Sequence, residues 1–197
     1  MFNCPPSPPF DKLREPKERI KSEIKMNIQE ELLKEHSKAQ TTKIATYIGN
    51  DADKFKELMD LFLGKEQLLN QRSAWVVSTV FEKQPQLILP FLPKLIANLH
   101  RPVHDAVKRN TLKIVQHISI PDNLQGEVCQ ICFPLLQAND TAIAIKVFAM
   151  TVIKNICKEQ PDLKNELQLI LEDQLPHASK GFIARAKKTL KELAAIR

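Results

Sequence analysis

The chain has 197 residues, a formal net charge of +6, 13 prolines and only four glycines. This length is enough for one domain with a hydrophobic core, and the scarcity of glycine argues against hairpin-rich β folds and against Gly-rich phosphate loops. There is no run of about 18 apolar residues, so the sequence predicts no transmembrane helix. The first ten residues lack the continuous apolar stretch of a secretory signal.

The N-terminal segment differs in composition from the rest of the chain. Residues 1–9 are proline-rich, and residues 10–25 are highly charged. We predict that residues 1–25 form a disordered or poorly packed extension, because such a composition cannot bury enough apolar surface. We predict that residues 26–197 form a single domain, since helical periodicity begins directly after Met26.

Apolar residues recur at helical spacing from residue 27 to the end of the chain, with no strand-like alternation. Two short helices are expected around Ile28 and Ile44, the second ending at Gly49. Longer helices then alternate, separated by Pro, Gly and Asp. We predict first helices at 53–64, 86–100, 122–139 and 162–175, and second helices at 65–84, 105–119, 141–160 and 180–197.

The helices form a repeating unit of about 38 residues. Val107 lies 38 positions before Ile145, and Ile183 follows after another 38. Ile118 and Ile156 are also 38 positions apart. A fixed period of this length is typical of stacked helical hairpins, in which each hairpin contacts only its neighbours. The sequence therefore predicts an all-α stack, with Ile114, Val152 and Ile156 buried between adjacent hairpins.

The opening of the second helix carries a family resemblance. Asp140, Ile145, Lys146 and Ala149 match the pattern of Asp, an apolar-basic pair and a small residue in HEAT repeats. The preceding unit keeps the apolar-basic pair at Val107 and Lys108 but has Pro102 and Thr111 at the other two positions, and the last unit has Ala184 at the basic one. The resemblance covers about residues 53–197, and the stretch before it resembles the capping helices of small bacterial HEAT-like proteins.

This resemblance implies a right-handed α-α superhelix, a HEAT-like solenoid of about four helical hairpins with N-terminal capping helices. It places first helices on the convex face and second helices on the concave face. The predicted second helices carry a summed charge of +10 and the first helices −5. The candidate binding surface therefore consists of basic residues of the second helices: Arg72, Lys108, Arg109, Lys113, Lys146, Lys154, Arg185, Lys187 and Lys188.

Two interpretations of these basic residues remain open. They form a groove for an acidic protein segment or a phosphate backbone, or some of them hold neighbouring repeats together. The second interpretation applies to Arg72, Lys108, Lys146 and Arg185, which recur at helix openings. For Lys113, Lys154, Lys187 and Lys188 we expect no structural role.

The favoured function is a non-catalytic scaffold that binds a protein partner, for which we expect an acidic character, and no membrane. The alternative is a DNA-binding HEAT-like protein related to the alkylpurine DNA glycosylases. Those enzymes combine aromatic residues with a carboxylate, whereas this chain has one tryptophan, Trp75. Asp105 and Asp140 stand at helix starts, where we expect them to be N-caps. We therefore predict no enzymatic activity.

The cysteines do not suggest a metal or redox centre. Cys129 and Cys132 form a CxxC, but no second CxxC or paired histidines follow to complete a zinc site. Both lie in an apolar helix stripe with Cys157 in a later helix, so we expect them to pack as small hydrophobic residues. We predict no cofactor, and the scattered cysteines suit a cytoplasmic protein. The sequence leaves the oligomeric state open.

Overall fold

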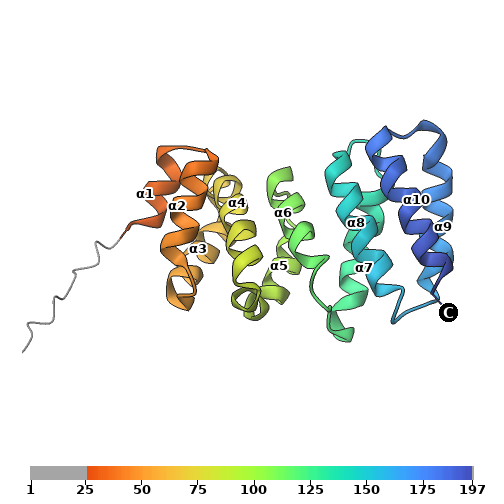
Figure 1. Cartoon of the computed structure of the whole chain (residues 1–197), viewed down its shortest axis with the longest axis horizontal. Helices are drawn as coiled ribbons and strands as arrows, with labels where there is room; N and C mark the ends of the chain where they lie inside the picture. Colours follow the sequence, from red (N-terminus) through yellow and green to blue (C-terminus); the bar gives the residue numbers. More distant parts are fainter. Residues whose placement is uncertain (1–25, 197) are drawn as a thin grey trace, which may run out of the picture.

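The computed structural model describes residues 26–196, and every regular element within that range is a helix (Figure 1). The predicted all-α fold is confirmed, while the predicted extension, residues 1–25, lies outside the described residues. The helices of the described range are α1 (Ile28–Lys34), α2 (Lys38–Ile48), α3 (Ala52–Leu63), α4 (Gln67–Lys83), α5 (Leu92–Asn98), α6 (Asp105–Val115), α7 (Asp122–Gln137), α8 (Ile143–Ile156), α9 (Leu163–Gln174) and α10 (Lys180–Ala194), with 3₁₀ turns at Pro85–Phe91 and Leu175–His177.

Successive helices follow one another as pairs along a single row (Figure 1). The even-numbered helices form the more closely packed layer: α2 packs on α4, α4 on α6, α6 on α8 and α8 on α10. The odd-numbered helices α3, α5 and α7 touch one another much less. We call α4, α6, α8 and α10 the second-helix layer. The short helices α1 and α2, expected as caps, continue the same stack.

The close approach of the second helices has a simple origin in the sequence. Each one carries a small, fully buried residue at an equivalent position: Ala74, Thr111, Ala149 and Ala186. A short side chain at the point of contact lets two helix backbones lie closer together than leucine or isoleucine would. The small residue of the repeat pattern therefore sets the spacing between neighbouring repeats.

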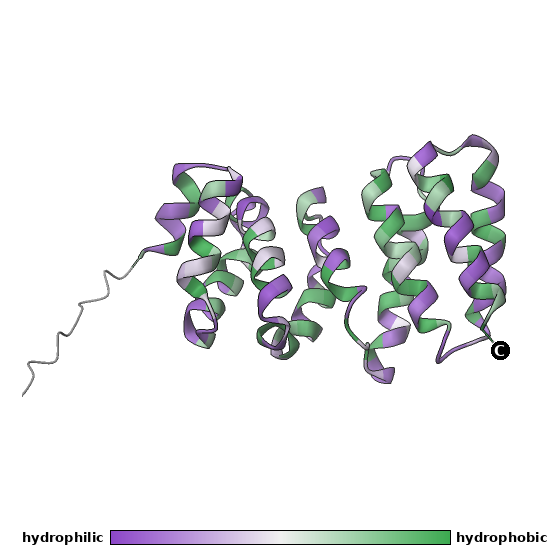
Figure 2. Cartoon of the chain, in the orientation of Figure 1, coloured by the Kyte–Doolittle hydropathy of each residue, from purple (hydrophilic) through white to green (hydrophobic). Residues whose placement is uncertain are grey.

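The hydrophobic core consists of two clusters. One runs from Ile28 to Ile114 and the other from Leu92 to Leu193, and both draw on α5 and α6. Figure 2 shows the hydrophobic stretches where helices face one another and the hydrophilic ones on their outer sides. The predicted burial of Ile114, Val152 and Ile156 is confirmed. The two clusters therefore meet at α5 and α6.

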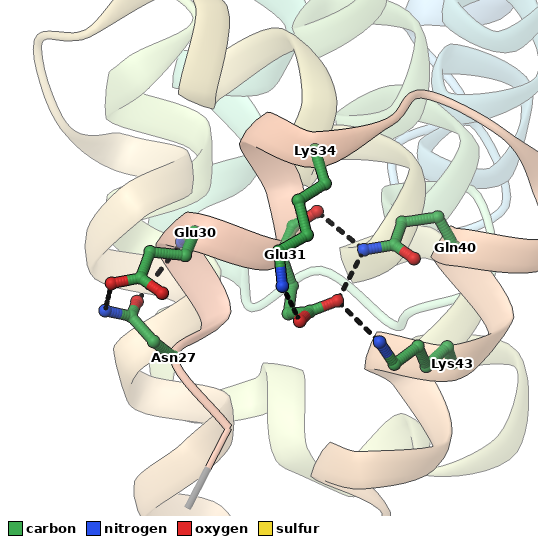
Figure 3. Close-up of polar contacts among 6 residues, drawn as sticks. All are labelled: Asn27, Glu30, Glu31, Lys34, Gln40 and Lys43. Carbon is green, nitrogen blue, oxygen red and sulfur yellow. Dashed lines mark hydrogen bonds and ion pairs between the residues drawn. The ribbon is translucent and has the colours of Figure 1, made fainter.

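A polar network joins α1 to α2 (Figure 3). The Glu31 carboxylate accepts hydrogen bonds from Lys34 at 2.6 Å and from Gln40 and Lys43 at 2.7 Å. Glu31 is only 8% exposed, so these donors replace the water that it loses. The bonds from Lys34, Lys43 and Gln40 lower the pKa of Glu31 to about 2.

Candidate binding surface

Arg72 is a structural residue rather than a free cation. Its Nη1 donates hydrogen bonds to the carbonyl oxygens of Leu32 at 2.9 Å and Leu33 at 2.8 Å. These carbonyls belong to the last turn of α1, where a helix has no internal donors left. Arg72 therefore caps α1 from α4, as the structural interpretation of this residue predicted.

The same kind of bond recurs along the stack. Arg101 donates to the carbonyls of Leu63 at 3.0 Å and Gly64 at 3.2 Å, at the end of α3. Asn155 donates to the Gln116 carbonyl at 2.8 Å, 39 residues earlier, and Gln174 donates to the Leu136 carbonyl at 3.0 Å, 38 residues earlier. We call these bonds, with those of Arg72, inter-repeat caps. Arg101, Asn155 and Gln174 were missed from the sequence, although a polar donor one period beyond a helix end is a detectable signal.

Lys108 and Lys146 occupy equivalent positions but have different partners. The Lys108 ammonium lies 3.7 Å from Asp105 on its own helix. Lys146 is only 8% exposed, and its Nζ donates to Oε1 of Gln174 at 3.0 Å. Burial lowers the pKa of Lys146. Lys146 thus bridges two repeats as the structural interpretation predicted, whereas Lys108 pairs with a carboxylate of its own helix.

Two lysines that were expected to have no structural role form ion pairs across the second-helix layer. Lys113 of α6 pairs with Glu82 of α4 at 2.7 Å, and Lys154 of α8 pairs with Glu192 of α10 at 2.9 Å. The Lys154 side chain is only 12% exposed, and its hydrogen bond lowers the pKa of Glu192. The expectation was therefore wrong for both lysines, because each is turned toward a carboxylate on a neighbouring helix.

Three of the nine candidate cations have no hydrogen bond or ion pair within residues 26–196: Arg109, Arg185 and Lys187. Lys188 forms only a long, exposed ion pair of 3.8 Å with Glu192. Arg109 and Lys187 are exposed, and Arg185 is half-buried. Five of the nine candidates therefore already have a hydrogen bond or ion pair within the fold: Arg72, Lys108, Lys113, Lys146 and Lys154.

Arg109 lines a surface pocket of about 350 Å³ that we call the central pocket. Its walls come from the loop between α1 and α2 and from α4, α6 and α8, so it crosses the second-helix layer. The residues that line it are His36, Gln71, His104, Asp105, Ala106, Arg109, Ala142, Ala144 and Ile145. The sequence pointed to Arg109 but not to the alanines that leave space around it.

Trp75 lies beside the central pocket rather than in a catalytic arrangement. Its half-buried ring packs edge-on against His36, with ring centroids 5.6 Å apart. Trp75 is thus an interface residue between α4 and the loop after α1. The expected N-capping by Asp105 and Asp140 is wrong, because His104 caps α6 through Nδ1 and Ala142 precedes α8 with no side-chain cap.

The cysteines pack in the core as predicted. Cys129, Cys132 and Cys157 are buried and belong to the C-terminal cluster. Burial raises the pKa of Cys129 and Cys157 to about 11 and that of Cys132 still further, which disfavours the reactive thiolate. Among residues 26–196, no group of three or more His, Cys, Asp or Glu side chains is arranged to hold a metal ion. No helix in this range is long and apolar enough to cross a membrane.

Comparison with known proteins agrees with this architecture. No curated protein and no solved structure matches the chain. The family model described as a HEAT repeat domain matches residues 28–193. The match begins at α1, earlier than the resemblance at about residue 53, so the two N-terminal helices are part of the family's domain. The chain belongs to the HEAT repeat family.

Proposed function

We propose that this protein is a non-catalytic scaffold that binds an acidic segment of a partner protein along the second-helix layer. HEAT repeat domains are typically protein-interaction scaffolds. The observation that carries the proposal is the central pocket, where the exposed guanidinium of Arg109 stands among Ala106, Ala142 and Ala144. Alanines let a peptide backbone approach closely, and an unpaired guanidinium offers two parallel donors to a carboxylate.

Arg185, which has no hydrogen bond or ion pair within residues 26–196, extends this surface toward the C-terminus. Arg185, Lys188 and Glu192 are spaced along one side of α10, and Glu192 is joined to Lys154 of α8. Arg185 therefore lies on the flank of α10 that faces α8. Lys187 follows Arg185 by two residues, about 200° around a helix, so it lies on another side. An acidic segment that follows the second-helix layer would meet Arg109 and Arg185 but not Lys187.

The test uses Trp75, the only tryptophan of the chain, as a reporter beside the central pocket. A glutamate-rich peptide is titrated while the emission of Trp75 is followed, and a labelled copy gives the affinity by anisotropy. We expect saturable binding that weakens as salt screens the charges. The double variant Arg109→Glu with Arg185→Glu should lose roughly tenfold or more in affinity.

Lys187→Glu is the matched control for the single variant Arg185→Glu, because each reverses one charge on α10. Equal losses in these two single variants would contradict a defined surface and indicate general charge attraction. Duplex DNA of similar charge is titrated in parallel at the same ionic strength. Tighter binding to DNA than to the peptide, with a steep salt slope, would favour the nucleic-acid alternative instead.

A further inference from the structure

A groove of about 270 Å³ lies between the first helices of the last two repeats. It is formed by the first half of α7, the end of α8 and the start of α9, at the C-terminal end of the row of helices (Figure 1). Helices α7 and α9 both pack on α8, but they are not closely packed on each other. The space between them is therefore left open, and we call it the α7–α9 groove.

Part of the groove's lining is apolar. Cys129, Ile156 and Leu163 line it, and Gly126 opens it further, because a Cβ added there would meet nothing within 4 Å. Gly126 lies inside a 16-residue helix, where glycine is unfavourable and where packing does not require it. The glycine instead leaves room for a side chain from another molecule.

The charged part of the lining is acidic. Asp122 at the start of α7 and Asp162 just before α9 line the groove, and both are exposed. The lining contains no Lys, Arg or His. Among residues 26–196, neither aspartate forms an ion pair. The groove therefore carries negative charge that the described part of the chain does not neutralise.

Gln125 shows that hydrogen-bond donors are scarce at this groove, which it also lines. Its side-chain Nε2 lies within hydrogen-bond distance of three oxygens, the Ile120 carbonyl at 3.0 Å, Asp122 at 3.2 Å and Glu159 at 2.5 Å, although an amide has only two such hydrogens. Its Oε1 is buried and has no donor within residues 26–196. Turning the amide over would place this oxygen against the same three acceptors, so the shortage of donors would remain.

We propose that the α7–α9 groove binds an arginine side chain of a partner protein, with the guanidinium between Asp122 and Asp162. A guanidinium carries five N–H donors and no acceptor, which matches a site with an excess of acceptors. It is also less strongly hydrated than an ammonium group, so it suits a groove whose lining is partly apolar. The methylene stem of the arginine covers Cys129 and Leu163.

The experiment is an NMR titration of the ¹⁵N-labelled protein with the capped peptide acetyl-Ala-Arg-Ala-amide at constant ionic strength. We expect saturable shifts of the Gly126 and Leu163 amides. One matched peptide carries citrulline, which has nearly the shape of arginine without its charge, and should bind roughly tenfold or more weakly. A second carries lysine and should bind roughly threefold or more weakly. The absence of saturable shifts with the arginine peptide, or equal affinity for either matched peptide, overturns the proposal.

Charge variants assign the shifts to the groove. Asp122→Asn with Asp162→Asn should weaken binding roughly three- to tenfold, since two exposed charge contacts are lost. Asparagine at 122 still offers an oxygen to Gln125, and both aspartates are exposed, so the fold is preserved. Asp53→Asn with Asp60→Asn removes two exposed charges from α3 and is the matched control, for which we expect no change. Equal affinities in the two double variants would refute the assignment.

A second pair of variants tests the open space. Gly126→Leu places a side chain in the groove and should weaken binding roughly tenfold or more. Gly181→Leu is its control, because Gly181 is also a helical glycine with nothing within 4 Å of an added Cβ, and it lies outside the groove. Circular dichroism checks that both variants fold. Unchanged binding in folded Gly126→Leu would show that the peptide lies elsewhere.

The α7–α9 groove and the surface proposed for the acidic segment can be tested separately. The variant with Arg109→Glu and Arg185→Glu should still bind the arginine peptide, because neither residue lines the groove. The variant with Asp122→Asn and Asp162→Asn should still bind the glutamate-rich peptide. Failure of either peptide to bind therefore contradicts only its own proposal.

Discussion

The N-terminal and C-terminal repeats use their charged residues and glycines differently. In the N-terminal part, Arg72 caps two carbonyls, and Gly49 and Gly64 end helices. Gly49 has a φ of +53°, and a Cβ at Gly64 would come within 3.0 Å of a carbonyl oxygen. The fold requires these residues.

The C-terminal part shows the opposite pattern. Lys146 has a single amide partner, and Arg185 and Lys187 have none within the described range. Gly126 and Gly181 lie inside helices with open space where a side chain would go. Residues that a fold does not require are available for contacts with other molecules. We therefore expect Arg185 to be available for the contacts proposed above.

The largest effect should follow from a cavity in the C-terminal core. Ile156→Ala should lower the free energy of unfolding by about 2–5 kcal/mol, because a buried isoleucine leaves a void. Chemical denaturation measures the loss. Leu169→Ala is the control and should change stability by about 0.5 kcal/mol or less, since Leu169 is 67% exposed. Hydrogen exchange should show the lost protection mainly in α7 to α10. Unchanged stability would contradict the assigned core.

The second-largest loss of stability is expected from a substitution in the N-terminal part of the chain. Arg72→Met should cost about 1–3 kcal/mol, because two carbonyls at the end of α1 lose a charged donor. Arg109→Met removes the same charge at an exposed position that has no partner in the described part of the chain, and its cost should stay within about 0.5 kcal/mol. Thermal or urea denaturation compares the two variants. Equal costs would show that Arg72 is no more structural than a free surface arginine.

Acid should weaken the N-terminal hairpin through Glu31. Its pKa is lowered from 4.5 to about 2 in the folded chain, chiefly by Lys34 and Lys43. The unfolded chain therefore binds the proton more readily, and the stabilisation is complete above pH 4.5 and is lost as pH falls toward 2. Glu31→Gln should reduce this pH dependence in denaturation experiments between those limits. An identical slope in wild type and variant would exclude Glu31 as a source.

The smallest change in stability is expected from substitution of single glycines by alanine. Gly126→Ala should stabilise the protein by about 0.5–1 kcal/mol, because alanine favours a helix interior and nothing obstructs its methyl group. Gly49→Ala should destabilise it, since the positive φ disfavours any side chain. Melting temperatures of the two variants should move in opposite directions. A shift in the same direction would remove the contrast between the two parts of the chain.

Periodicity predicted the repeat and the core because burial follows the local spacing of apolar residues along one helix. The burial of Ile114 and Ile156 could therefore be predicted from the spacing of apolar residues within their own helices. The pairing of Lys113 with Glu82 depends instead on how two helices are rotated against each other, which no single helix encodes. Lys154 and Glu192 are 38 residues apart. Comparing charges one period apart would therefore have found that pair.

The second helices were predictable from the sequence, but the roles of their basic residues were not. The candidate residues were chosen by their charge, and this criterion cannot distinguish an exposed arginine from one that reaches a carbonyl. The distinction between Arg72 and Arg109 depends on whether a helix end lies within reach of the side chain. The alanines of the central pocket carry no charge or motif, so only the folded arrangement reveals the space they leave.

The inter-repeat caps have a direction along the chain. In each of them the donor lies about one repeat downstream of the carbonyl it satisfies, from Arg72 acting on α1 to Gln174 acting on α7. Because a ribosome delivers the N-terminus first, the carbonyl groups at the ends of α1, α3, α6 and α7 gain these donors only after about one further repeat has been synthesised. Each of these four helix ends is therefore completed by the repeat that follows it.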